Sequence, residues 1–257
     1  LDQVEAHQDL IKSCDVMIHI ATAWHDDDYS MQINYHKTLE MFRYAAEGRC
    51  KKIIYFSTAS ILGRDNKPNP DALELGPMYI KSKYRAHKAM QTLTDTPPIY
   101  TVFPTLVLGG SNQVPYSHIS GGIKDHQRYV KIARFLSAKG QFHFMHGKDI
   151  ASVATHLVIN DEDQKEFVLG QQKITIKQGI RDISRACGNR VYWQFPLNNR
   201  FVVKLAKLLG VKFDPWGEYC ALNYDQSYQV TNPGHFNRTN YFPTIGDAVL
   251  DIEGIKN

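Results

Sequence analysis

Residues 53–63 read Ile-Ile-Tyr-Phe-Ser-Thr-Ala-Ser-Ile-Leu-Gly, a short apolar run that passes directly into a turn rich in small hydroxyl side chains. The run lacks the polar and apolar alternation of a half-exposed strand, so it predicts a strand buried on both faces of a parallel sheet. In open α/β sheets, ligands bind where such strands reach their carboxyl ends. The turn at 57–63 is therefore a candidate location for a functional site.

Two further apolar runs have the same character, Val-Met-Ile-His-Ile-Ala at 16–21 and Tyr-Thr-Val-Phe at 100–103. Helical patterns separate the three runs, one from Ile33 to Ala45 and one from Tyr79 to Leu93. Strand, helix, strand, helix, strand predicts parallel pairing with right-handed crossovers. The sequence thus favours an α/β fold, in which His19 is a hydrogen-bonded histidine of the core.

The chain beyond Gly110 predicts a smaller region attached to this sheet. Its expected elements are a helix at 127–138, a strand at 142–145, a helix at 149–159, a strand at 166–169, a helix at 176–187 and a basic amphipathic helix at 201–209. The last helix could cover a substrate pocket or lie on a membrane surface, and the first is the simpler interpretation.

Composition narrows the class of protein. A chain of 257 residues with 43% hydrophobic content can bury the core of one large α/β domain, or of a domain with a smaller annex. The formal charge is only +4 and the basic residues are scattered, so no nucleic-acid partner is indicated. No stretch reaches the roughly 18 to 20 apolar residues that span a bilayer, so no integral membrane segment is expected.

The four cysteines are Cys14, Cys50, Cys187 and Cys220. They share no short spacing, so the sequence indicates neither a disulfide framework nor a zinc site, and we expect no metal. Reduced thiols fit a cytoplasmic location.

Two matches to Tyr-x-x-x-Lys lie on the helix predicted after residue 78, Tyr79 with Lys83 and Tyr84 with Lys88. Residues four apart on a helix share a face, so each match brings a phenol and an ammonium together. A tyrosine that exchanges protons at pH 7 needs its pKa lowered from near 10, about 4 kcal/mol of cationic help. The spacing alone is weak, because among 14 tyrosines about one match arises by chance.

Context separates the two matches. Residues 76–83 read Gly-Pro-Met-Tyr-Ile-Lys-Ser-Lys, with a proline two positions before Tyr79 and a serine directly before Lys83. This block resembles the Pro-x-Tyr-x-x-Ser-Lys block of extended short-chain dehydrogenases/reductases, of the NAD-dependent epimerase/dehydratase type. Nothing comparable surrounds Tyr84, so we expect Tyr79 and Lys83 to be the functional pair.

Other blocks follow in the same family's order. Residues 15–22, Asp-Val-Met-Ile-His-Ile-Ala-Thr, resemble its Asp-x-Val-x-His-x-Ala-Ala strand, and Asn34 falls where the family has an asparagine. Residues 103–109, Phe-Pro-Thr-Leu-Val-Leu-Gly, resemble its Arg-Pro-x-x-Val-x-Gly block near the nicotinamide. Residues 145–151, Met-His-Gly-Lys-Asp-Ile-Ala, resemble its His-x-x-Asp-Val-Ala segment. Together with 53–63 and 76–83, these are five ordered blocks, which is far more specific than any single one.

The resemblance implies a partial Rossmann-type parallel sheet with helices on both faces plus a smaller C-terminal substrate-binding region. It implies a partial NAD(P)-binding Rossmann domain at 1–110, without its first βαβ portion. Residues 111–257 would be mainly substrate-binding, with 141–170 returning to the sheet. It further implies a small-molecule substrate and leaves a homodimer possible.

The resemblance also implies the site residues. Tyr79 would shuttle the proton, Lys83 would hold the ribose and lower the pKa of Tyr79, and a hydroxyl after the second strand would bind the substrate oxygen. Counting back from Gly63 places that last role on Thr58 rather than Ser57, although the family more often has serine there. The residues expected to contact NAD or NADP are Ala21, Thr22, Ala23, Asn34, Ser57, Tyr79, Lys83, Pro104, Thr105 and Val107.

The family's Gly-x-x-Gly-x-x-Gly turn, which seats the pyrophosphate on a helix N-terminus, is absent from these residues. The residue that selects NAD or NADP is absent too, and the chain starts at Leu1 in a helix-like segment. We therefore expect an upstream segment, and weak cofactor binding by the 257 residues alone.

The resemblance leaves the net reaction open between reduction of a ketone or aldehyde and epimerisation or dehydration of a nucleotide sugar. Phe103 stands where the sugar-nucleotide branch has arginine, and Pro-Thr-Leu-Val at 104–107 favours the reductase branch. A non-catalytic dinucleotide sensor is the other alternative, but it would not need intact Tyr79, Lys83 and Thr58. The loops at 111–122 and 193–240 carry no block that identifies the substrate.

Overall fold

The structure is a computed structural model that describes residues 1–24, 26–111, 113–125, 130–131, 134–208, 214–223 and 225–252. The chain divides into two compact units. The first comprises Leu1–Pro104 and Ala154–Val168, and the second comprises Thr105–Val153 and Leu169–Asn257. Each unit is described by itself.

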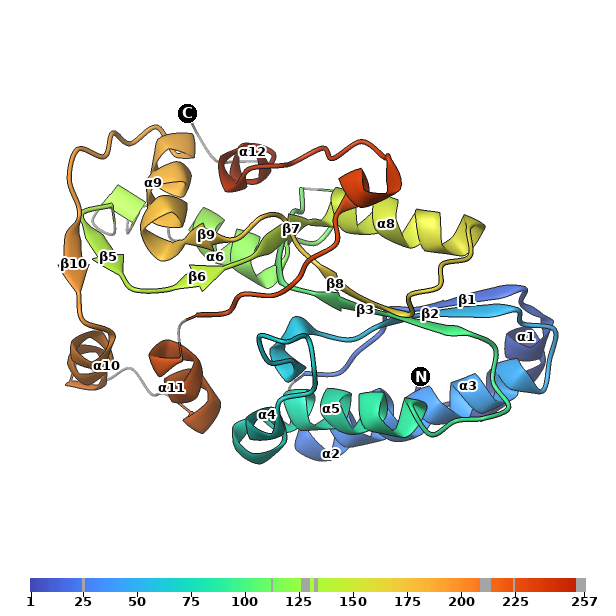
Figure 1. The fold of residues 1–257 in the computed structure, drawn as a ribbon. Helices are drawn as coiled ribbons and strands as arrows, with labels where there is room; N and C mark the ends of the chain where they lie inside the picture. The colour runs from blue at the N-terminus through green and yellow to red at the C-terminus, as the bar shows by residue number, and fades with distance from the viewer. Residues whose placement is uncertain are drawn as a thin grey trace. The chain divides into compact units, whose positions relative to one another are not determined.

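The first unit contains the central sheet (Figure 1). Its elements before residue 105 are η1 (Val4–His7), α1 (Gln8–Ser13), β1 (Val16–His19), α2 (Asp27–Met31), the π-helical η2 (Gln32–Lys37), α3 (Thr38–Ala46), β2 (Lys52–Phe56), η3 (Ala59–Ile61), α4 (Pro70–Leu75), α5 (Met78–Met90) and β3 (Ile99–Pro104). The helix α8 (Gly147–Ile159) ends in this unit, and β8 (Glu166–Leu169) begins in it.

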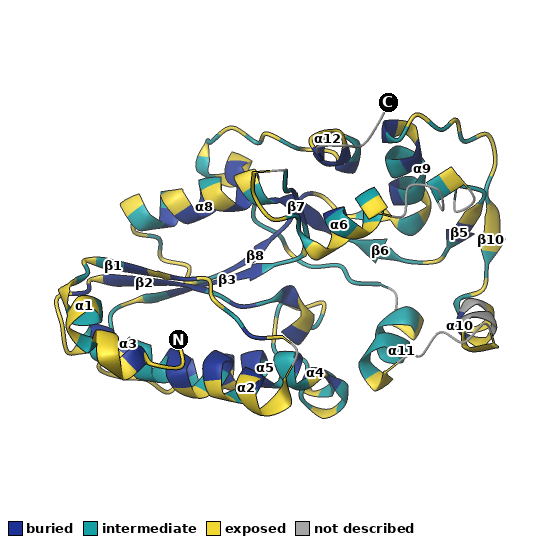
Figure 2. Ribbon diagram, turned by 180° about the vertical axis from the view of Figure 1, so that it is seen from behind, coloured by how far each residue is buried: buried dark blue, intermediate teal, exposed yellow. Residues whose placement is uncertain are grey.

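The sheet has the strand order β1-β2-β3-β8. Strands β1 and β2 pair in parallel with Ile18 opposite Ile54, and β2 and β3 pair in parallel with Ile54 opposite Tyr100. Helices α3 and α5 lie side by side along one face of these strands, and the last turns of α8 lie on the other (Figures 1 and 2). The predicted α/β fold, a parallel sheet flanked by helices, is confirmed.

Burial explains why residues 52–56 form the centre of this sheet. Ile53, Ile54 and Tyr55 are fully buried, since helices cover both faces of β2. A core of Met17, Phe42, Ala45, Tyr55, Ala86 and Met90 joins the strands to α3 and α5. Strand β1 ends at His19, two residues before the apolar run does, and His19 is buried with its Nε2 2.9 Å from Thr38 Oγ1, as predicted for a core histidine.

A close approach between α4 and α5 sets where α5 begins. Gly76 ends α4, and a Cβ atom placed on it would lie 2.4 Å from the Ala72 carbonyl oxygen and 2.7 Å from the Ile80 side chain. Only glycine fits between these atoms, and Pro77 then precedes the first residue of α5. The Gly-Pro pair therefore fixes the start of the helix that carries Tyr79.

The second unit holds several short strand pairs and helices. Its elements are β4 (Leu106–Leu108), α6 (His118–Asp125), β5 (Leu136–Ala138), β6 (Gln141–Phe142), β7 (Phe144–His146), β9 (Ile174–Thr175), α9 (Ile176–Ala186), β10 (Phe195–Leu197), α10 (Asn199–Leu208), α11 (Pro215–Leu222), η4 (Pro233–Phe236) and α12 (Ile245–Leu250). Strands β4 and β7 pair in parallel, as do β10 and β5, whereas β6 and β9 pair antiparallel. Helices α9 and α12 pack on a core that includes Leu108 and Phe144.

One expectation for the second unit is wrong. Residues 136–138 were expected to end a helix, but they form β5 and pair with residues 195–197 of β10. This pairing joins segments almost 60 positions apart, so no local pattern signals it. Residues 127–129 and 132–133 of the expected helix lie outside the described residues, and so does Leu209 at the end of the expected amphipathic helix. No helix in the described part of the chain is both long and apolar enough to cross a membrane.

Candidate active site

Tyr79 and Thr58 come together at the carboxyl end of β2. Tyr79 lies in the first turn of α5, and its phenol shares a side-chain hydrogen bond with Thr58. Thr58 caps η3, where its Oγ1 accepts a hydrogen bond of 3.2 Å from the Ser60 N–H. Because that acceptor role leaves the hydroxyl proton of Thr58 free to be donated, Thr58 can donate to the phenol oxygen of Tyr79.

Lys83 lies one helical turn after Tyr79, with only 1% of its surface exposed. Its Nζ donates a hydrogen bond of 2.9 Å to the Phe56 carbonyl oxygen and lies 4.9 Å from the centroid of the Tyr55 ring. Burial disfavours the charged form and lowers the pKa of Lys83 to about 7. The last residues of β2 therefore hold this amine in place while they weaken its charge.

The phenol of Tyr79 is in its acid form at neutral pH. Burial raises the pKa of Tyr79 to about 12, and the hydrogen bond with Thr58 opposes that rise. In this structure burial therefore decides the protonation state of Tyr79. A protonated phenol paired with a hydroxyl group is suited to give a proton to an oxygen atom that is gaining negative charge.

Two buried hydroxyl groups near this pair have no hydrogen-bond partner among the described residues. They are the Oγ of Ser57, the first residue after β2, and the phenol oxygen of Tyr55. An unsatisfied buried hydroxyl costs about 1–3 kcal/mol, so these groups are suited to a polar ligand that restores their hydrogen bonds. A hydroxyl-rich group such as a ribose fits the donors present here.

Asn34 ties the loop after β1 to α5. Its Oδ1 accepts hydrogen bonds from the Ala23 N–H at 2.8 Å and the Thr22 hydroxyl at 2.9 Å. Its Nδ2 donates to the Ala23 carbonyl at 2.9 Å and to the Ser82 Oγ at 3.1 Å. Asn34 is fully buried within the π-helical segment η2. Its amide is therefore saturated by protein groups, which points to a role in placing the loop.

Trp24, which the sequence analysis did not single out, stacks on Tyr79. The ring centroids are 4.0 Å apart and the ring planes differ by 12°. The only signal in the sequence is position, since Trp24 follows the predicted strand end by a few residues. The block that resembles the family ends at Thr22, so the resemblance gave no reason to choose Trp24.

The remaining predicted cofactor residues are divided between the units. Ala21 is exposed in the loop after β1, and Pro104 is half-buried at the end of β3. Thr105 and Val107 belong to the second unit. There the Thr105 hydroxyl donates to the Leu169 carbonyl at 2.8 Å, and Val107 lines a cavity of about 540 Å³ together with His146.

Phe103 is packed into the first unit. It is 1% exposed and meets the His87 ring edge to face, with centroids 5.2 Å apart. The side chain that replaces the arginine of the sugar-nucleotide branch therefore contributes to the core. It offers no charge to a ligand.

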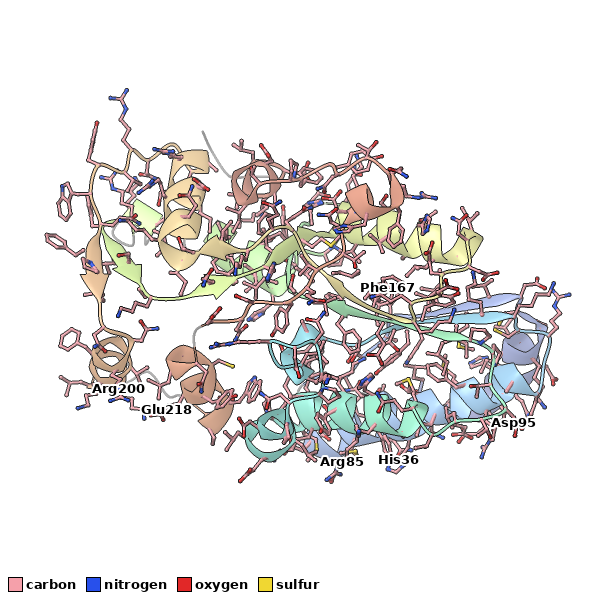
Figure 3. All side chains as sticks on the ribbon, viewed as in Figure 1. His36, Arg85, Asp95, Phe167, Arg200 and Glu218 are labelled. Carbon is pink, nitrogen blue, oxygen red and sulfur yellow. The ribbon has the colours of Figure 1, made fainter. Side chains whose placement is uncertain are left out.

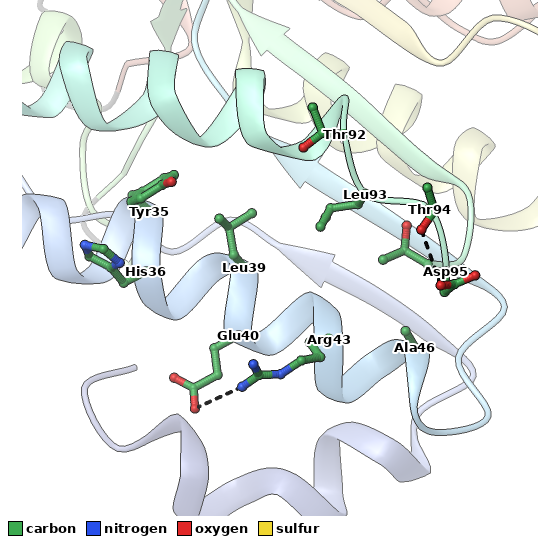
Figure 4. Close-up of a pocket in the computed structure, with 11 residues that line it drawn as sticks. Tyr35, His36, Leu39, Glu40, Arg43, Ala46, Thr92, Leu93, Thr94 and Asp95 are labelled. Carbon is green, nitrogen blue, oxygen red and sulfur yellow. Dashed lines mark hydrogen bonds and ion pairs between the residues drawn. The ribbon is translucent and has the colours of Figure 1, made fainter.

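A second cavity in the first unit, about 710 Å³ in volume, does not involve the predicted site residues (Figure 4). It is lined by η2, α3 and the connection from α5 to β3, with Leu39 and Leu93 beside polar groups. Glu40 pairs with Arg43 at its edge, 3.9 Å apart. No three His, Cys, Asp or Glu side chains are grouped for metal binding within the part of the chain that the structure describes.

The sequence of this chain matches a known family. A family model described as "NAD dependent epimerase/dehydratase family" matches residues 1–170. No curated protein matches by sequence.

Solved structures share the fold. The crystal structure of gox2253 has a TM-score of 0.70 and 19% identity, over 96% of this chain and 79% of that one. The human epimerase family protein SDR39U1 (isoform 2) with NADPH has a TM-score of 0.63 and 14% identity, over 95% of this chain and 84% of that one. A UDP-glucuronic acid 4-epimerase mutant from Bacillus cereus, in complex with NAD and a UDP-sugar analogue, has a TM-score of 0.62 and 14% identity, over 95% and 75%.

Proposed function

Because this chain belongs to the NAD dependent epimerase/dehydratase family, a family of enzymes, we propose that it is an NAD(P)-dependent oxidoreductase acting on a small-molecule alcohol or carbonyl compound. The observation that carries the proposal is the hydrogen-bonded pair of Tyr79 and Thr58, with Lys83 one turn further along α5. In this proposal the first unit mainly binds the dinucleotide and the second unit mainly binds the substrate. That division follows the predicted boundary near residue 110.

The residues after β1 and β2 fit a nicotinamide dinucleotide. Ser57 offers a buried hydroxyl without a partner, and Lys83 offers an amine at the same strand end. The bound cofactor would supply or accept a hydride at the carbon that carries the substrate oxygen. Ala21, Thr22 and Ala23 would line the dinucleotide, whereas Asn34 would act by fixing their loop.

Tyr79 would move the proton that balances this hydride. In the direction of reduction, the O–H bond of Tyr79 breaks and its proton passes to the substrate oxygen, which completes the alcohol. Thr58 would hydrogen-bond the same oxygen and then stabilise the phenolate left on Tyr79. Lys83, held on the Phe56 carbonyl, would bind the ribose and add positive charge once it is protonated.

Net reduction of a ketone or aldehyde is the first choice of reaction. It is favoured by Phe103, since a buried phenyl ring cannot replace the arginine of the sugar-nucleotide branch. Epimerisation or dehydration of a nucleotide sugar is the second candidate. It is favoured by the family's description and by the fold shared with an epimerase solved with a UDP-sugar analogue.

The test is turnover with NADH or NADPH against a panel of ketones, aldehydes and nucleotide sugars. The Tyr79→Phe variant should lose about 10²–10⁴-fold in kcat, because the ring stays in place but its proton is gone. The matched control is Tyr84→Phe, which changes the other Tyr-x-x-x-Lys tyrosine of the same helix and should keep the wild-type rate. Equal turnover by Tyr79→Phe and the wild type would refute the assignment.

A further inference from the structure

The indole of Trp24 stacks on the ring of Tyr79, the phenol of the candidate site. The two rings are nearly parallel at 4.0 Å, close enough for the indole to cover one face of the phenol. Trp24 nevertheless remains 58% exposed, so this indole is not part of the hydrophobic core. A stacked aromatic pair contributes about 0.5–1.5 kcal/mol beyond burial, and here it stabilises the position of the Tyr79 ring.

Hydrogen bonds fix the backbone next to both rings of the stack. Asn34 binds both backbone groups of Ala23, the residue directly before Trp24. The same amide donates to the Ser82 Oγ, which in turn donates to the Tyr79 carbonyl oxygen at 2.9 Å. Asn34 and Ser82 are both fully buried. One asparagine therefore fixes the backbone on each side of the ring pair.

From this arrangement we infer that Trp24 is a positioning residue for Tyr79, which holds the phenol ring against Thr58 and keeps water from one of its faces. The inference rests on the proposed proton-transfer role of Tyr79. It assigns to the loop after β1 a task besides contact with a dinucleotide. With the indole on one ring face, the hydroxyl of Tyr79 stays hydrogen-bonded to Thr58.

The alternative is that Trp24 is an ordinary surface side chain that happens to rest on Tyr79. The two views differ in what removal of the indole does to the phenol. If the indole shields Tyr79, the Trp24→Ala variant admits water to the ring face, and burial is the main cause that raises the pKa of Tyr79. The phenol then ionises at lower pH. If the contact is incidental, its ionisation does not change.

The experiment follows the ionisation of Tyr79 by NMR in protein that carries tyrosine labelled with ¹³C at Cζ, without cofactor. Tyr79 is assigned by the signal missing from Tyr79→Phe. In the wild type the pKa of Tyr79 should be about 12, and in Trp24→Ala it should fall toward the ordinary value of 10.0. Trp24→Phe keeps a flat ring at this position and should retain most of the shift. The groups that titrate beside Tyr79, Lys83 and Tyr55, are present in every variant.

A control is a second indole stacked on a phenol among the described residues, Trp216 on Tyr219, with the same 12° between planes. Trp216→Ala should leave the Tyr79 signal unchanged. We also expect kcat to fall in Trp24→Ala and to recover in Trp24→Phe. In Trp24→Ala the part of the pH profile that follows the ionisation of Tyr79 should move to lower pH. An unchanged Tyr79 titration in Trp24→Ala overturns it. Full turnover by Tyr79→Phe, with the titration shifted as expected, would instead sink the proposed function and leave the stack's effect on the phenol intact.

Discussion

Helix α5 carries the pattern Tyr-x-x-x-Lys twice within ten residues, and the two copies have different surroundings. Lys83 is buried on the Phe56 carbonyl, whereas Lys88 is exposed and donates to the Gln91 side chain at 3.4 Å. A shift of five residues turns a helix by about 140°, so the second pair cannot face the same way as the first. Arg85, next to Tyr84, projects away from the sheet (Figure 3).

The difference shows that spacing brings a phenol and an amine together, while the strand beneath them decides what they can do. Only the first pair lies over the carboxyl end of β2, where Thr58 meets the phenol and burial changes the pKa of both partners. The distinction between the two pairs would fail if a substitution of Tyr79 had the same effect as the same substitution of Tyr84. It would fail equally if Lys83 and Lys88 responded alike.

The largest expected effect concerns the pH dependence of stability. The folded-state pKa of Lys83, about 7, lies below the ordinary value of about 10.4. Between these values the unfolded chain holds a proton that the folded chain has released, so the free energy of unfolding rises with pH across this window. At about 1.4 kcal/mol for each pKa unit, the rise amounts to a few kcal/mol.

The measurement is urea unfolding between about pH 7 and pH 10 without nucleotide, read as the difference between each variant and the wild type. The difference is needed because burial raises the pKa of the thiols of Cys187 and Cys220, which adds a slope of opposite sign near the upper end of this window. Lys83→Met should remove the contribution, and Lys88→Met should leave it, since Lys88 is exposed. Equal slopes in the two variants would show that burial does not distinguish the two lysines.

A smaller effect is expected from the residue that links the first pair to the loop after β1. Asn34→Ala leaves the N–H and the carbonyl of Ala23 without partners in a buried setting, so the free energy of unfolding should fall by about 1–3 kcal/mol. Asn160→Ala is the control, because that amide is exposed and its loss should change stability by less than about 0.5 kcal/mol. Similar losses of unfolding free energy in the two variants would argue against a stabilising link through Asn34 between the loop after β1 and α5.

Local pattern was sufficient to predict the elements that build this site. The apolar run at 53–56 lies within β2, and the helix predicted from Tyr79 is α5, because both signals lie within a few adjacent residues. Trp24 and the burial of Lys83 were not predictable in this way. The stack depends on Asn34 reaching Ser82, 48 positions away, and Lys83 depends on a carbonyl 27 positions before it.

The same reason explains what was missed in the second unit. Residues 136–138 look helical alone and become a strand only because β10 pairs with them. Asp149, by contrast, was part of a recognisable block, and it is fully buried where it accepts hydrogen bonds from the N–H groups of Tyr241 and Phe242 at 2.7 and 3.0 Å. The block therefore identified a residue that holds another segment in place, although the segment around Tyr241 and Phe242 carried no interpretable pattern.

The smallest expected effect decides between the two hydroxyl groups after β2. Thr58→Val removes the hydrogen bond to Tyr79, and because that bond lowers the pKa of the phenol, the pKa should rise further. A net loss of about 0.5–1.5 kcal/mol corresponds to a fall in kcat of roughly 2- to 10-fold, and Thr58→Ser should restore it. Ser57→Ala should weaken cofactor binding instead, since the Ser57 Oγ has no partner within the described chain. If Ser57→Ala lowered kcat more than Thr58→Val, the catalytic hydroxyl would belong to Ser57, and the hydrogen bond between Thr58 and Tyr79 would be incidental to the chemistry.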